Sequence, residues 1–278
     1  MKKVELNYIN KLVKLSIDED KINQDITSKL TIPNNFITNV KIISKGYGIL
    51  YGIELVKKII KVIDKTIIIK VYKSDGHLIK PNIKIAELKG KARSILKIER
   101  IILNFLGHLS GVATETKNLI HKTKKYKTKI CCTRKTIPGL RYLQKKAVKV
   151  AGGTNNRYNL KEEIFIKDNH HLDSKKFRDK ILLTINKNKN KKIINVEVDN
   201  IIQLKKIIDL KIDRILLDNF SPTNLKKALR LIPNKIETEA SGNINKSNIL
   251  NYAKTGVKRI SLGYLTHSVK NFDFSLEY

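Results

Sequence analysis

The chain of 278 residues is long enough for one large or two modest domains, each with a hydrophobic core. Hydrophobic residues make up 41% of the sequence, a normal value for globular proteins, which excludes a wholly disordered chain. The net charge of +32 would attract polyanions, but the lysines are spread along the whole chain and no basic segment carries interleaved aromatic residues. Composition therefore favours a general drift toward lysine over a dedicated nucleic-acid surface.

The only cysteines are the adjacent Cys131 and Cys132, in a segment with the composition of a buried strand. Their spacing excludes a disulfide framework or a cysteine-based metal site, so buried, reduced thiols are expected, as in cytoplasmic proteins. No apolar segment reaches the length of a membrane span, and the N-terminal residues lack the apolar core of a signal peptide. We therefore predict a cytoplasmic protein with no membrane partner.

The residues before position 90 predict a small, mostly antiparallel α+β domain. Apolar residues recur there at helical or alternating spacing, in segments bounded by turn-forming residues. The expected elements are, in chain order, a helix over 5–15, a strand from Phe36, a helix over 54–64, a strand over 67–72, a turn at 74–76 and a strand over 83–88. With the helix that follows, they are assigned to a first domain of residues 1–110.

A helical pattern extends from Ala92 to about residue 125. Isoleucine, phenylalanine and leucine form its apolar stripe, and Arg100 lies on the opposite, polar side. By this pattern alone, Arg100 is a solvated surface residue. Ser110 and Gly111 are expected to loosen the helix, with a second helix running past Thr114. The second domain is predicted to comprise residues 111–278.

After residue 127, strands alternate with helices. The expected strands are 129–133, 163–168, 193–199, 214–219, 235–241 and 259–263. The expected helices between them are 140–150, 174–186, 201–210, 224–231 and 246–253. Strands that recur every 20 to 35 residues or so are typical of right-handed βα units. The segment therefore predicts an α/β fold with about six parallel strands, in a β/α barrel or a doubly wound sheet.

Polar residues gather at the carboxyl ends of these predicted strands, where parallel β/α proteins place their active sites. The cations Arg134, Lys135, Arg157 and Lys167 suit a polyanionic ligand. The first two follow a buried strand and precede Pro138, which is expected at the first position of a helix. For that segment taken alone, a solvated Arg-Lys pair in a loop is the alternative.

Acidic residues and glycines also occur at the carboxyl ends of the predicted strands. Glu197 and Asp218 end neighbouring strands and suit Mg²⁺, with pairing to nearby cations as the alternative. Ser241-Gly242-Asn243 and Gly263 are typical of loops that bind phosphate through backbone N–H groups. The sequence contains no evident nucleophile–base pair, Walker-type loop or dinucleotide-binding glycine motif. The pattern indicates transfer from a phosphorylated donor rather than hydrolysis.

Motifs spread over nearly the whole chain carry a family resemblance. They are DITS at 25–28, ERIILNFLGHLSGVAT at 99–114, TRKTIPGLR at 133–141, GGTNNR at 152–157, IKDNH at 166–170, VEVD at 196–199, ILLDN at 215–219, SGNI at 241–244 and SLGYLTHS at 261–268. In this order they resemble the carboxylating nicotinate-nucleotide pyrophosphorylases, also called quinolinate phosphoribosyltransferases. The resemblance implies an N-terminal open-faced α/β sandwich, a C-terminal incomplete β/α barrel and a homodimer with shared active sites. It also implies conversion of quinolinate and phosphoribosyl pyrophosphate to nicotinate mononucleotide, pyrophosphate and carbon dioxide, with Mg²⁺.

The resemblance also implies roles for individual residues. Quinolinate contacts are expected from Thr133, Arg134, Lys135, Asn156, Arg157 and Lys167, with Arg100 reaching in from the partner subunit. Contacts to phosphoribosyl pyrophosphate are expected from Lys135, Lys167, Glu197, Asp218, Ser241, Gly242, Asn243, Ser261, Leu262 and Gly263. The expected catalytic residues are Lys135, Lys167, Glu197 and Asp218, and the last two are expected to hold the metal partly through the donor and water. This role for Arg100 replaces its interpretation as a surface residue.

The sequence departs from the family pattern at two positions. Asn156 stands where the family usually has His, and Ala151 replaces the usual third glycine of the same loop. An amide can donate a hydrogen bond but carries no charge, so Asn156 is expected to alter substrate affinity or rate. The alternatives are a related phosphoribosyltransferase acting on another anionic pyridine-like substrate, a non-catalytic descendant, and a basic nucleic-acid-binding protein.

Overall fold

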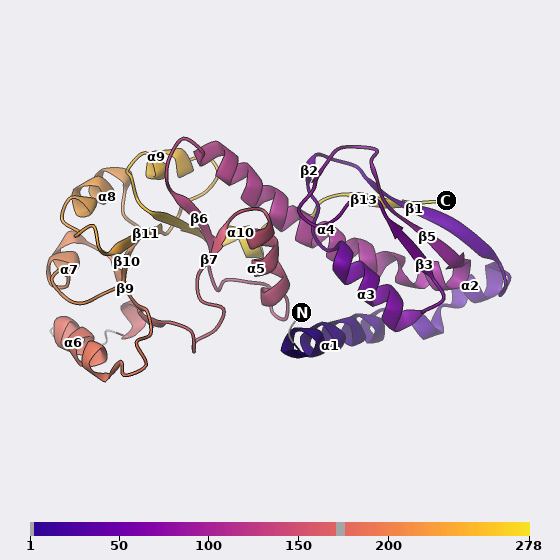
Figure 1. Ribbon diagram of the computed structural model, residues 1–278, viewed down its shortest axis with the longest axis horizontal. Coiled ribbons are helices and arrows are strands. Elements are labelled where there is room, and N and C mark those ends of the chain that lie inside the picture. Colours follow the sequence, from indigo (N-terminus) through magenta and orange to yellow (C-terminus); the bar gives the residue numbers. More distant parts are fainter. Residues whose placement is uncertain (1–2, 171–175) are drawn as a thin grey trace. The chain divides into compact units, whose positions relative to one another are not determined.

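The computed structural model describes residues 3–170 and 176–278. The chain divides into two compact units, one formed by residues up to Glu115 together with Val269–Tyr278 and the other by Thr116–Ser268. Each unit contains a sheet of its own (Figure 1). The start of the helix predicted over 174–186 lies outside the described residues.

The first unit is built on an antiparallel sheet with the strand order β13-β1-β5-β3. Its strands are β1 (Ile37–Ser44), β3 (Ile68–Val71), β5 (Lys84–Lys91) and β13 (Phe274–Glu277), with a separate pair formed by β2 (Gly48–Ile49) and β4 (Leu78–Ile79). Its helices are α1 (Lys3–Glu19), the short 3₁₀ helix η1 (Ile22–Gln24), α2 (Ile26–Thr31), α3 (Ile53–Ile63) and most of α4 (Ala92–Thr123). On β1, Val40 and Ile42 are buried while Asn39 and Lys41 are exposed, so one face of the sheet is covered and the other faces solvent. This is the predicted open-faced sandwich.

Helix α4 is continuous from Ala92 to Thr123, so the interruption predicted at Ser110 and Gly111 is wrong. Instead, the glycines of this helix let the backbone of the C-terminal segment come close. A Cβ atom on Gly107 would lie 2.7 Å from the carbonyl oxygen of Phe272, and one on Gly111 would collide with the carbonyl oxygen of Lys270. Intrahelical hydrogen bonds outweigh the weak helix propensity of two residues, and the missing side chains make room for the C-terminal segment.

The last residues of the chain belong to the first unit. Strand β13 pairs antiparallel with β1, and the backbone N–H of Phe272 donates to the carbonyl of Gly107 (2.9 Å). The division predicted at residues 110 and 111 assigned this segment to the second domain. A four-residue strand has too little periodicity to reveal which sheet it will join.

The second unit is a sheet of seven parallel strands in the order β7-β6-β12-β11-β10-β9-β8. The strands are β6 (Lys129–Cys132), β7 (Thr154–Asn155), β8 (Ile164–Ile166), β9 (Ile194–Val198), β10 (Arg214–Asp218), β11 (Glu237–Ser241) and β12 (Arg259–Leu262). All six predicted strands are confirmed, and β7 is additional. In the described chain β7 and β8 form the two edges, so the sheet is an incomplete barrel.

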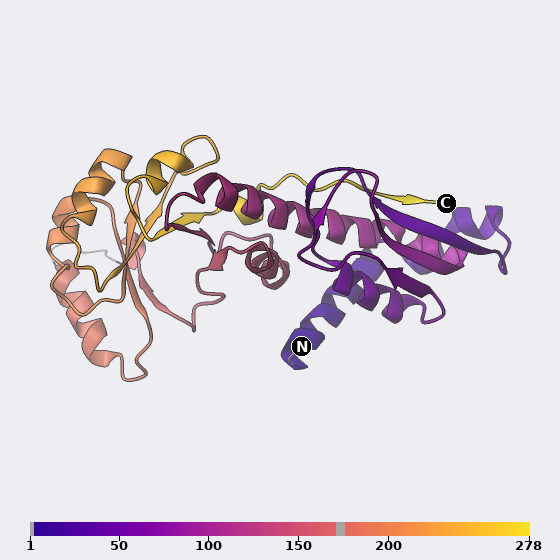
Figure 2. The ribbon, with the colours of Figure 1, turned by 45° about the horizontal axis from the view of Figure 1, so that its top comes forward.

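Helices follow most strands of this second sheet. They are α5 (Arg141–Val150), the 3₁₀ helix η2 (Asp168–His170), α6 (Phe177–Lys187), α7 (Ile201–Lys205), α8 (Pro222–Leu229), α9 (Ile249–Ala253) and α10 (Tyr264–His267). Figures 1 and 2 show α6 to α9 along one side of the sheet. Helix α5 begins only at Arg141, because Gly139 has a left-handed φ of 77° that is incompatible with a helix, so the prediction that Pro138 opens this helix is wrong.

Burial in the second unit follows the predicted pattern. Every residue of β9 is buried, as are the first four of β10. Cys131 and Cys132 are free thiols with no exposed surface, as expected. Among the described helices, none has an apolar stretch long enough to cross a lipid bilayer.

Candidate active site

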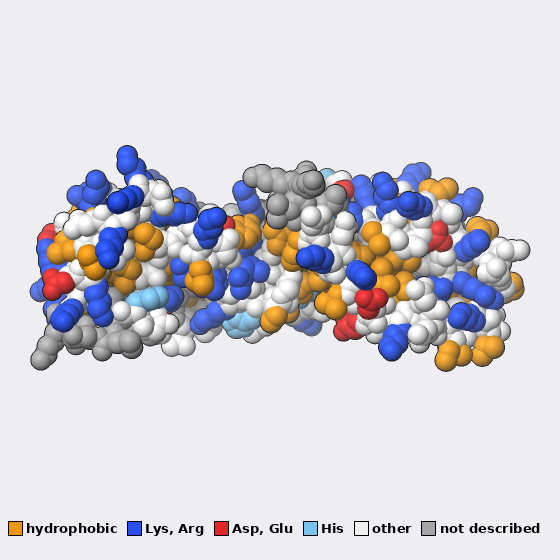
Figure 3. All heavy atoms as spheres, turned by 90° about the horizontal axis from the view of Figure 1, so that it is seen from below, with side chains coloured by type: hydrophobic (Ala, Val, Ile, Leu, Met, Phe, Trp, Pro, Cys, Tyr) orange, Lys and Arg blue, Asp and Glu red, His pale blue; other side chains and the backbone are white. Residues whose placement is uncertain are grey.

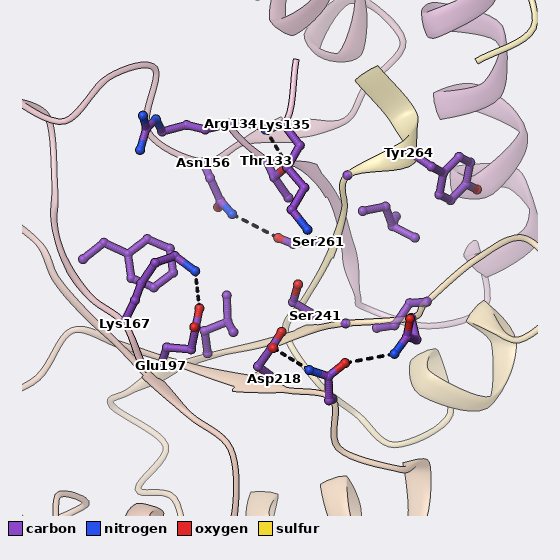
Figure 4. A pocket seen from close by; sticks show the side chains of 18 of the residues that line it. Thr133, Arg134, Lys135, Asn156, Lys167, Glu197, Asp218, Ser241, Ser261 and Tyr264 are labelled. Atoms are coloured by element: carbon purple, nitrogen blue, oxygen red, sulfur yellow. Dashed lines mark hydrogen bonds and ion pairs between the residues drawn. The ribbon is translucent and has the colours of Figure 1, made fainter. Parts of the chain in front are cut away.

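A cavity of about 670 Å³ opens at the carboxyl ends of the parallel strands in the second unit (Figure 4). It brings together every predicted site residue except Arg100. The predicted residues in its lining are Thr133, Arg134, Lys135, Asn156, Arg157, Lys167, Glu197, Asp218, Ser241, Gly242, Asn243, Ser261, Leu262 and Gly263. Their convergence follows from the parallel register, which places all strand ends at one edge of the sheet.

Arg100 lies on α4 in the first unit, with 75% of its side chain exposed. Its guanidinium is 3.9 Å from the carboxylate of the adjacent Glu99. It does not line the cavity of its own chain. Its expected role in a partner's site therefore stays a prediction.

Two arginines form one wall of the cavity. The backbone carbonyl of Glu163 accepts a hydrogen bond from Nη1 of Arg157 (3.0 Å). The Nε atoms of Arg134 and Arg157 are buried and have no hydrogen-bond partner among the described residues. Burial, and after it the neighbouring charge of Arg134, lowers the pKa of Arg157. Desolvated donors that repel one another favour binding of an anion between them.

Phe165 provides an apolar surface beside these cations. Its ring centroid lies 5.2 Å from the guanidinium carbon of Arg157 and 4.8 Å from Nζ of Lys167. An aromatic ring with two cations beside it suits a flat, negatively charged ligand, because the ring contributes apolar surface and the cations contribute charge.

Glu197 and Asp218 lie on the neighbouring strands β9 and β10. Oε2 of Glu197 accepts from Nζ of Lys167 at 2.5 Å, and Glu197 keeps only 6% of its side chain exposed. Oδ2 of Asp218 accepts from the side-chain amide of Asn219 at 2.7 Å. From the sequence, pairing with a nearby cation is the alternative to binding Mg²⁺, and Glu197 does form such a pair, with Lys167. Figure 4 shows both carboxylates on one side of the cavity.

These two carboxylates are compatible with Mg²⁺. Within the described residues, no group of three or more His, Cys, Asp or Glu side chains gathers into a metal site. Mg²⁺ usually takes one or two protein carboxylates and fills its remaining positions with substrate phosphate and water. The donor set therefore suits a metal that arrives with a phosphorylated ligand.

The loop after β11 has the backbone conformation of a tight cradle. Gly242 and Asn243 have φ angles of 86° and 52°, and Asn219 on the facing loop has 54°. A Cβ atom on Gly242 would lie 2.7 Å from the backbone nitrogen of Asn219 and would also strike its side chain. Helix α9 begins only at Ile249, so the cradle is the loop itself rather than the start of a helix.

Lys135 is held by residues that follow β12. The backbone N–H of Lys135 donates to Oγ1 of Thr133 (3.0 Å), and its carbonyl accepts from Oγ1 of Thr266 (2.6 Å). A Cβ atom on Gly263 would lie only 3.0 Å from Cδ of Lys135, so glycine allows the lysine stem to pass close to the backbone. The exposed lysine thus reaches the cavity from a fixed backbone.

Asn156 is part of a buried polar network below the cavity. Its side-chain Nδ2 donates to Oε1 of Glu239 (2.6 Å) and to Oγ of Ser261 (3.1 Å). Its Oδ1 accepts from Nη2 of Arg259 (2.7 Å), and the hydroxyl of Ser261 also donates to Glu239. Figure 4 shows the amide directed toward Ser261.

Several residues near the site were not predicted. Those that line the cavity are Phe165, Leu216, Asn219, Ile244, Tyr264 and His267. Asn219 and Tyr264 follow predicted site residues directly and lie within the quoted motifs ILLDN and SLGYLTHS, although no role was assigned to them. Glu239 carried a clearer signal, because it is an acidic residue two positions before Ser241, on the same face of a strand expected to be buried.

Known proteins match this chain over nearly its whole length. Residues 25–110 match the family described as "Quinolinate phosphoribosyl transferase, N-terminal domain", and residues 112–277 match the C-terminal domain of the same family. A probable carboxylating nicotinate-nucleotide pyrophosphorylase of Bacillus subtilis is 37% identical over 276 residues, covering 97% of this chain and 93% of the relative. One from Methanocaldococcus jannaschii is also 37% identical, over 98% of this chain and 97% of the relative.

The fold agrees as well. The structure of the nicotinate-nucleotide pyrophosphorylase from Francisella tularensis superposes with a TM-score of 0.92 and 39% identity, over 98% of this chain and 96% of that one. Together with these matches, the parallel half-barrel and the open-faced sandwich place the chain among two-domain phosphoribosyltransferases. The chain belongs to the quinolinate phosphoribosyltransferase family.

Proposed function

We propose that this protein is a quinolinate phosphoribosyltransferase of NAD biosynthesis, which converts quinolinate and phosphoribosyl pyrophosphate to nicotinate mononucleotide, pyrophosphate and carbon dioxide. The observation that carries the proposal is the pair of buried, unpartnered Nε donors on Arg134 and Arg157, in the same cavity as Glu197 and Asp218. Relatives that match 97% of this chain carry names that describe this reaction.

The cation wall suits quinolinate, which is a flat ring with two adjacent carboxylates. Arg134 and Arg157 can each present a planar guanidinium to a carboxylate, and Phe165 lies against their side of the cavity. Lys167 is close to the same ring and to Glu197, so it lies between the proposed acid-binding wall and the two carboxylates. The carboxylate oxygens of quinolinate would supply the hydrogen-bond acceptors that the Nε atoms of both arginines lack.

Phosphoribosyl pyrophosphate is assigned to the opposite part of the cavity. The Ser241-Gly242-Asn243 loop and Gly263 provide a backbone cradle for a phosphate, and Lys135 supplies a nearby cation. Glu197 and Asp218 would face the ribose and, with donor oxygens and water, would hold Mg²⁺. When bound, Mg²⁺ would neutralise charge on the departing pyrophosphate.

The chemistry follows from this arrangement. The ring nitrogen of quinolinate attacks the anomeric carbon of the donor, and the bond to pyrophosphate breaks. Positive charge that develops on the ribose is stabilised by the carboxylates of Glu197 and Asp218. The positive ring nitrogen of the adduct then stabilises the electron pair that remains on the adjacent ring carbon when its carboxylate leaves as carbon dioxide, and a proton from water joins that carbon to complete nicotinate mononucleotide. The protein orients the two substrates and forms no covalent bond to either.

The proposal includes a homodimer in which Arg100 of one subunit completes the quinolinate site of its partner. The exposure of the Arg100 side chain, whose guanidinium lies 3.9 Å from the carboxylate of Glu99, supports this assignment. The expected cytoplasmic location stays a prediction.

The nucleic-acid alternative requires a gathered basic surface. Figure 3 shows lysine and arginine side chains scattered among other residues over the visible face. This distribution favours general surface drift, in agreement with the sequence.

The decisive test is an assay of the purified protein with quinolinate, phosphoribosyl pyrophosphate and Mg²⁺, following nicotinate mononucleotide and released carbon dioxide. We expect turnover with quinolinate and none when nicotinate replaces it, because nicotinate has one carboxylate for two guanidiniums. A folded protein that forms no product from quinolinate would refute the proposal. Preference for another pyridine acid would point to the related-transferase alternative.

A further inference from the structure

Asn156 lies between the buried interior of the half-barrel and the cavity. It follows β7 and immediately precedes Arg157, and only 6% of its surface is exposed. Its backbone is held on both sides, because its N–H donates to the carbonyl of Cys132 (3.2 Å) and its carbonyl accepts from Nζ of Lys145 (2.7 Å). Lys145 is itself fully buried. The chain is therefore fixed at the residue before Arg157.

The side chain of Asn156 has no donor left for a ligand. A primary amide has two N–H bonds, and here one is directed to Glu239 and the other to Ser261. A hydrogen bond to a substrate would remove one of these contacts. Glu239 is fully buried, so its carboxylate depends on such donors for the solvation it lost on folding.

The network also sets which way the amide faces. Arg259 can only donate and the Glu239 carboxylate can only accept, so Oδ1 of Asn156 must face Arg259 and its NH₂ group must face Glu239. Asparagine provides one acceptor and two donors at these places. Aspartate would place a second carboxylate against Glu239, and an apolar residue would make none of the contacts.

Glu239 links two residues of the cavity lining through hydrogen bonds. One of its oxygens accepts from both Asn156 and Ser261, which line the cavity at the β7 and β12 sides. The other lies 3.3 Å from Nε of Arg259. Arg157, next along the chain, must stay close to Arg134 although the two guanidiniums repel each other. A fixed backbone at Asn156 opposes that repulsion.

We propose that Asn156 and Glu239 are positioning residues that act through Arg157. The amide of Asn156, held by Glu239, Ser261 and Arg259, does not bind the substrate but fixes the backbone from which Arg157 reaches a substrate carboxylate. This inference rests on the proposed function and revises the expected direct contact between Asn156 and quinolinate. Asn156 would thus affect quinolinate binding by setting the position of Arg157, and not by touching the substrate.

The test compares Asn156→Leu and Glu239→Gln with the wild-type protein, using steady-state kinetics. We expect the KM for quinolinate to rise about tenfold or more for Asn156→Leu, with a change of less than about twofold in the KM for phosphoribosyl pyrophosphate. Glu239→Gln keeps the shape and one acceptor, so the same selective effect should be smaller. Asn159→Ala is the matched control, because Asn159 is an exposed asparagine of the same loop that bonds to Glu162.

A double-variant cycle separates positioning from direct contact. If Asn156 acts through Arg157, the effect of Asn156→Leu should nearly disappear in an Arg157→Ala background. The second readout is calorimetric binding of benzene-1,2-dicarboxylate, which has the two adjacent carboxylates but no ring nitrogen to react. Its affinity should fall with Asn156→Leu and should not fall further when Asn156→Leu is added to Arg157→Ala.

The outcomes are distinct. Additive effects in the cycle would show that Asn156 contacts the substrate directly and would overturn the inference, as would unchanged binding of the diacid by a folded Asn156→Leu protein. Should Asn156→Leu fail to fold, Glu239→Gln in the same cycle decides the question. A wild-type protein that forms no product would instead refute the proposed function.

Discussion

At the scale of single residues, arginine and lysine occupy different places. Only nine of the 57 basic residues are arginine, yet Arg157, Arg214 and Arg259 are all buried in the second unit. Arg214 donates to Glu237 (2.7 Å) and also contacts Glu163 (3.3 Å), so its planar group satisfies two acids inside the half-barrel. The surface is left mainly to lysine. Three of the nine arginines are thus buried, either beside acidic residues or in the wall of the cavity.

The two cysteines give a prediction at this scale. Burial raises the pKa of Cys131 from the ordinary 9.0 to about 12 and also raises the pKa of Cys132. Because the thiolate is the reactive form, iodoacetamide should leave both residues unmodified in the native protein at pH 8 and should label both in denaturant. Mass spectrometry of the two samples makes this measurement. Rapid labelling of the native protein would contradict the burial.

The same pKa shifts affect stability. As pH rises through the ordinary range of cysteine, the unfolded chain loses thiol protons that the folded chain keeps, which favours unfolding. The contribution of these thiols is therefore fully present below pH 8 and decreases above about 9. Denaturant titrations at pH 7 and pH 10, compared with a Cys131→Ala protein, should show a smaller pH-dependent loss in the variant.

At the scale of elements, loops rather than helix ends form the proposed phosphate cradle. The loop after β11 turns sharply at two consecutive left-handed residues, and it packs against the loop after β10 through the Asn243–Asn219 hydrogen bond (3.1 Å). The short helix α9 starts six residues after Asn243. The backbone conformation, which depends on Gly242, decides the shape of this part of the cavity.

Replacing Gly242 with alanine should therefore weaken binding of phosphoribosyl pyrophosphate. The new Cβ atom would strain a φ of 86° and strike Asn219, so we expect the KM for this substrate to rise about tenfold, equivalent to roughly 1.4 kcal/mol. Gly256→Ala is the matched control, because Gly256 has a φ of 88° but has nothing within 4 Å of an added Cβ atom among the described residues. Equal changes in KM for both variants would contradict the proposed role of Gly242 in binding phosphoribosyl pyrophosphate.

At the scale of the whole molecule, the proposed dimer would divide each active site between two chains. The cavity of the second unit contains all the predicted site residues except Arg100, which lies on the first unit of the same chain. A two-fold dimer in which each chain gives its Arg100 to the other would complete both sites at once. This arrangement can be tested by mixing variants.

Arg100→Ala and Arg134→Ala proteins should each be nearly inactive with quinolinate. When they are unfolded and refolded together in equal amounts, half of the dimers should be mixed, and one of the two sites in each mixed dimer should be intact. The mixture should regain about a quarter of wild-type activity, as expected for random two-fold pairing. Wild type mixed with an Arg100→Ala, Arg134→Ala double variant controls for refolding. No gain of activity would show that Arg100 acts in its own chain or not at all.

Most of the architecture follows from local patterns in the sequence. Alternating and helical periodicity is a local property, so six of the seven parallel strands, the longer elements α1, β1, α3, β3 and β5 of the first unit, and the burial of both cysteines could be predicted. The two-residue strand β7 is too short to carry any pattern. The strand ends also revealed the members of the cavity, because parallel strands bring their carboxyl ends to one edge.

Contacts between distant segments could be read only from the folded chain. The return of β13 to β1, the close approach of the C-terminal segment to Gly107 and Gly111, and the joining of Asn156 to Glu239 and Ser261 connect residues far apart in the chain. Such contacts leave no periodic trace, because each depends on the shapes and hydrogen-bonding groups of two surfaces that form separately. The sequence thus placed Asn156 at the cavity, and folding decided that its amide faces the protein.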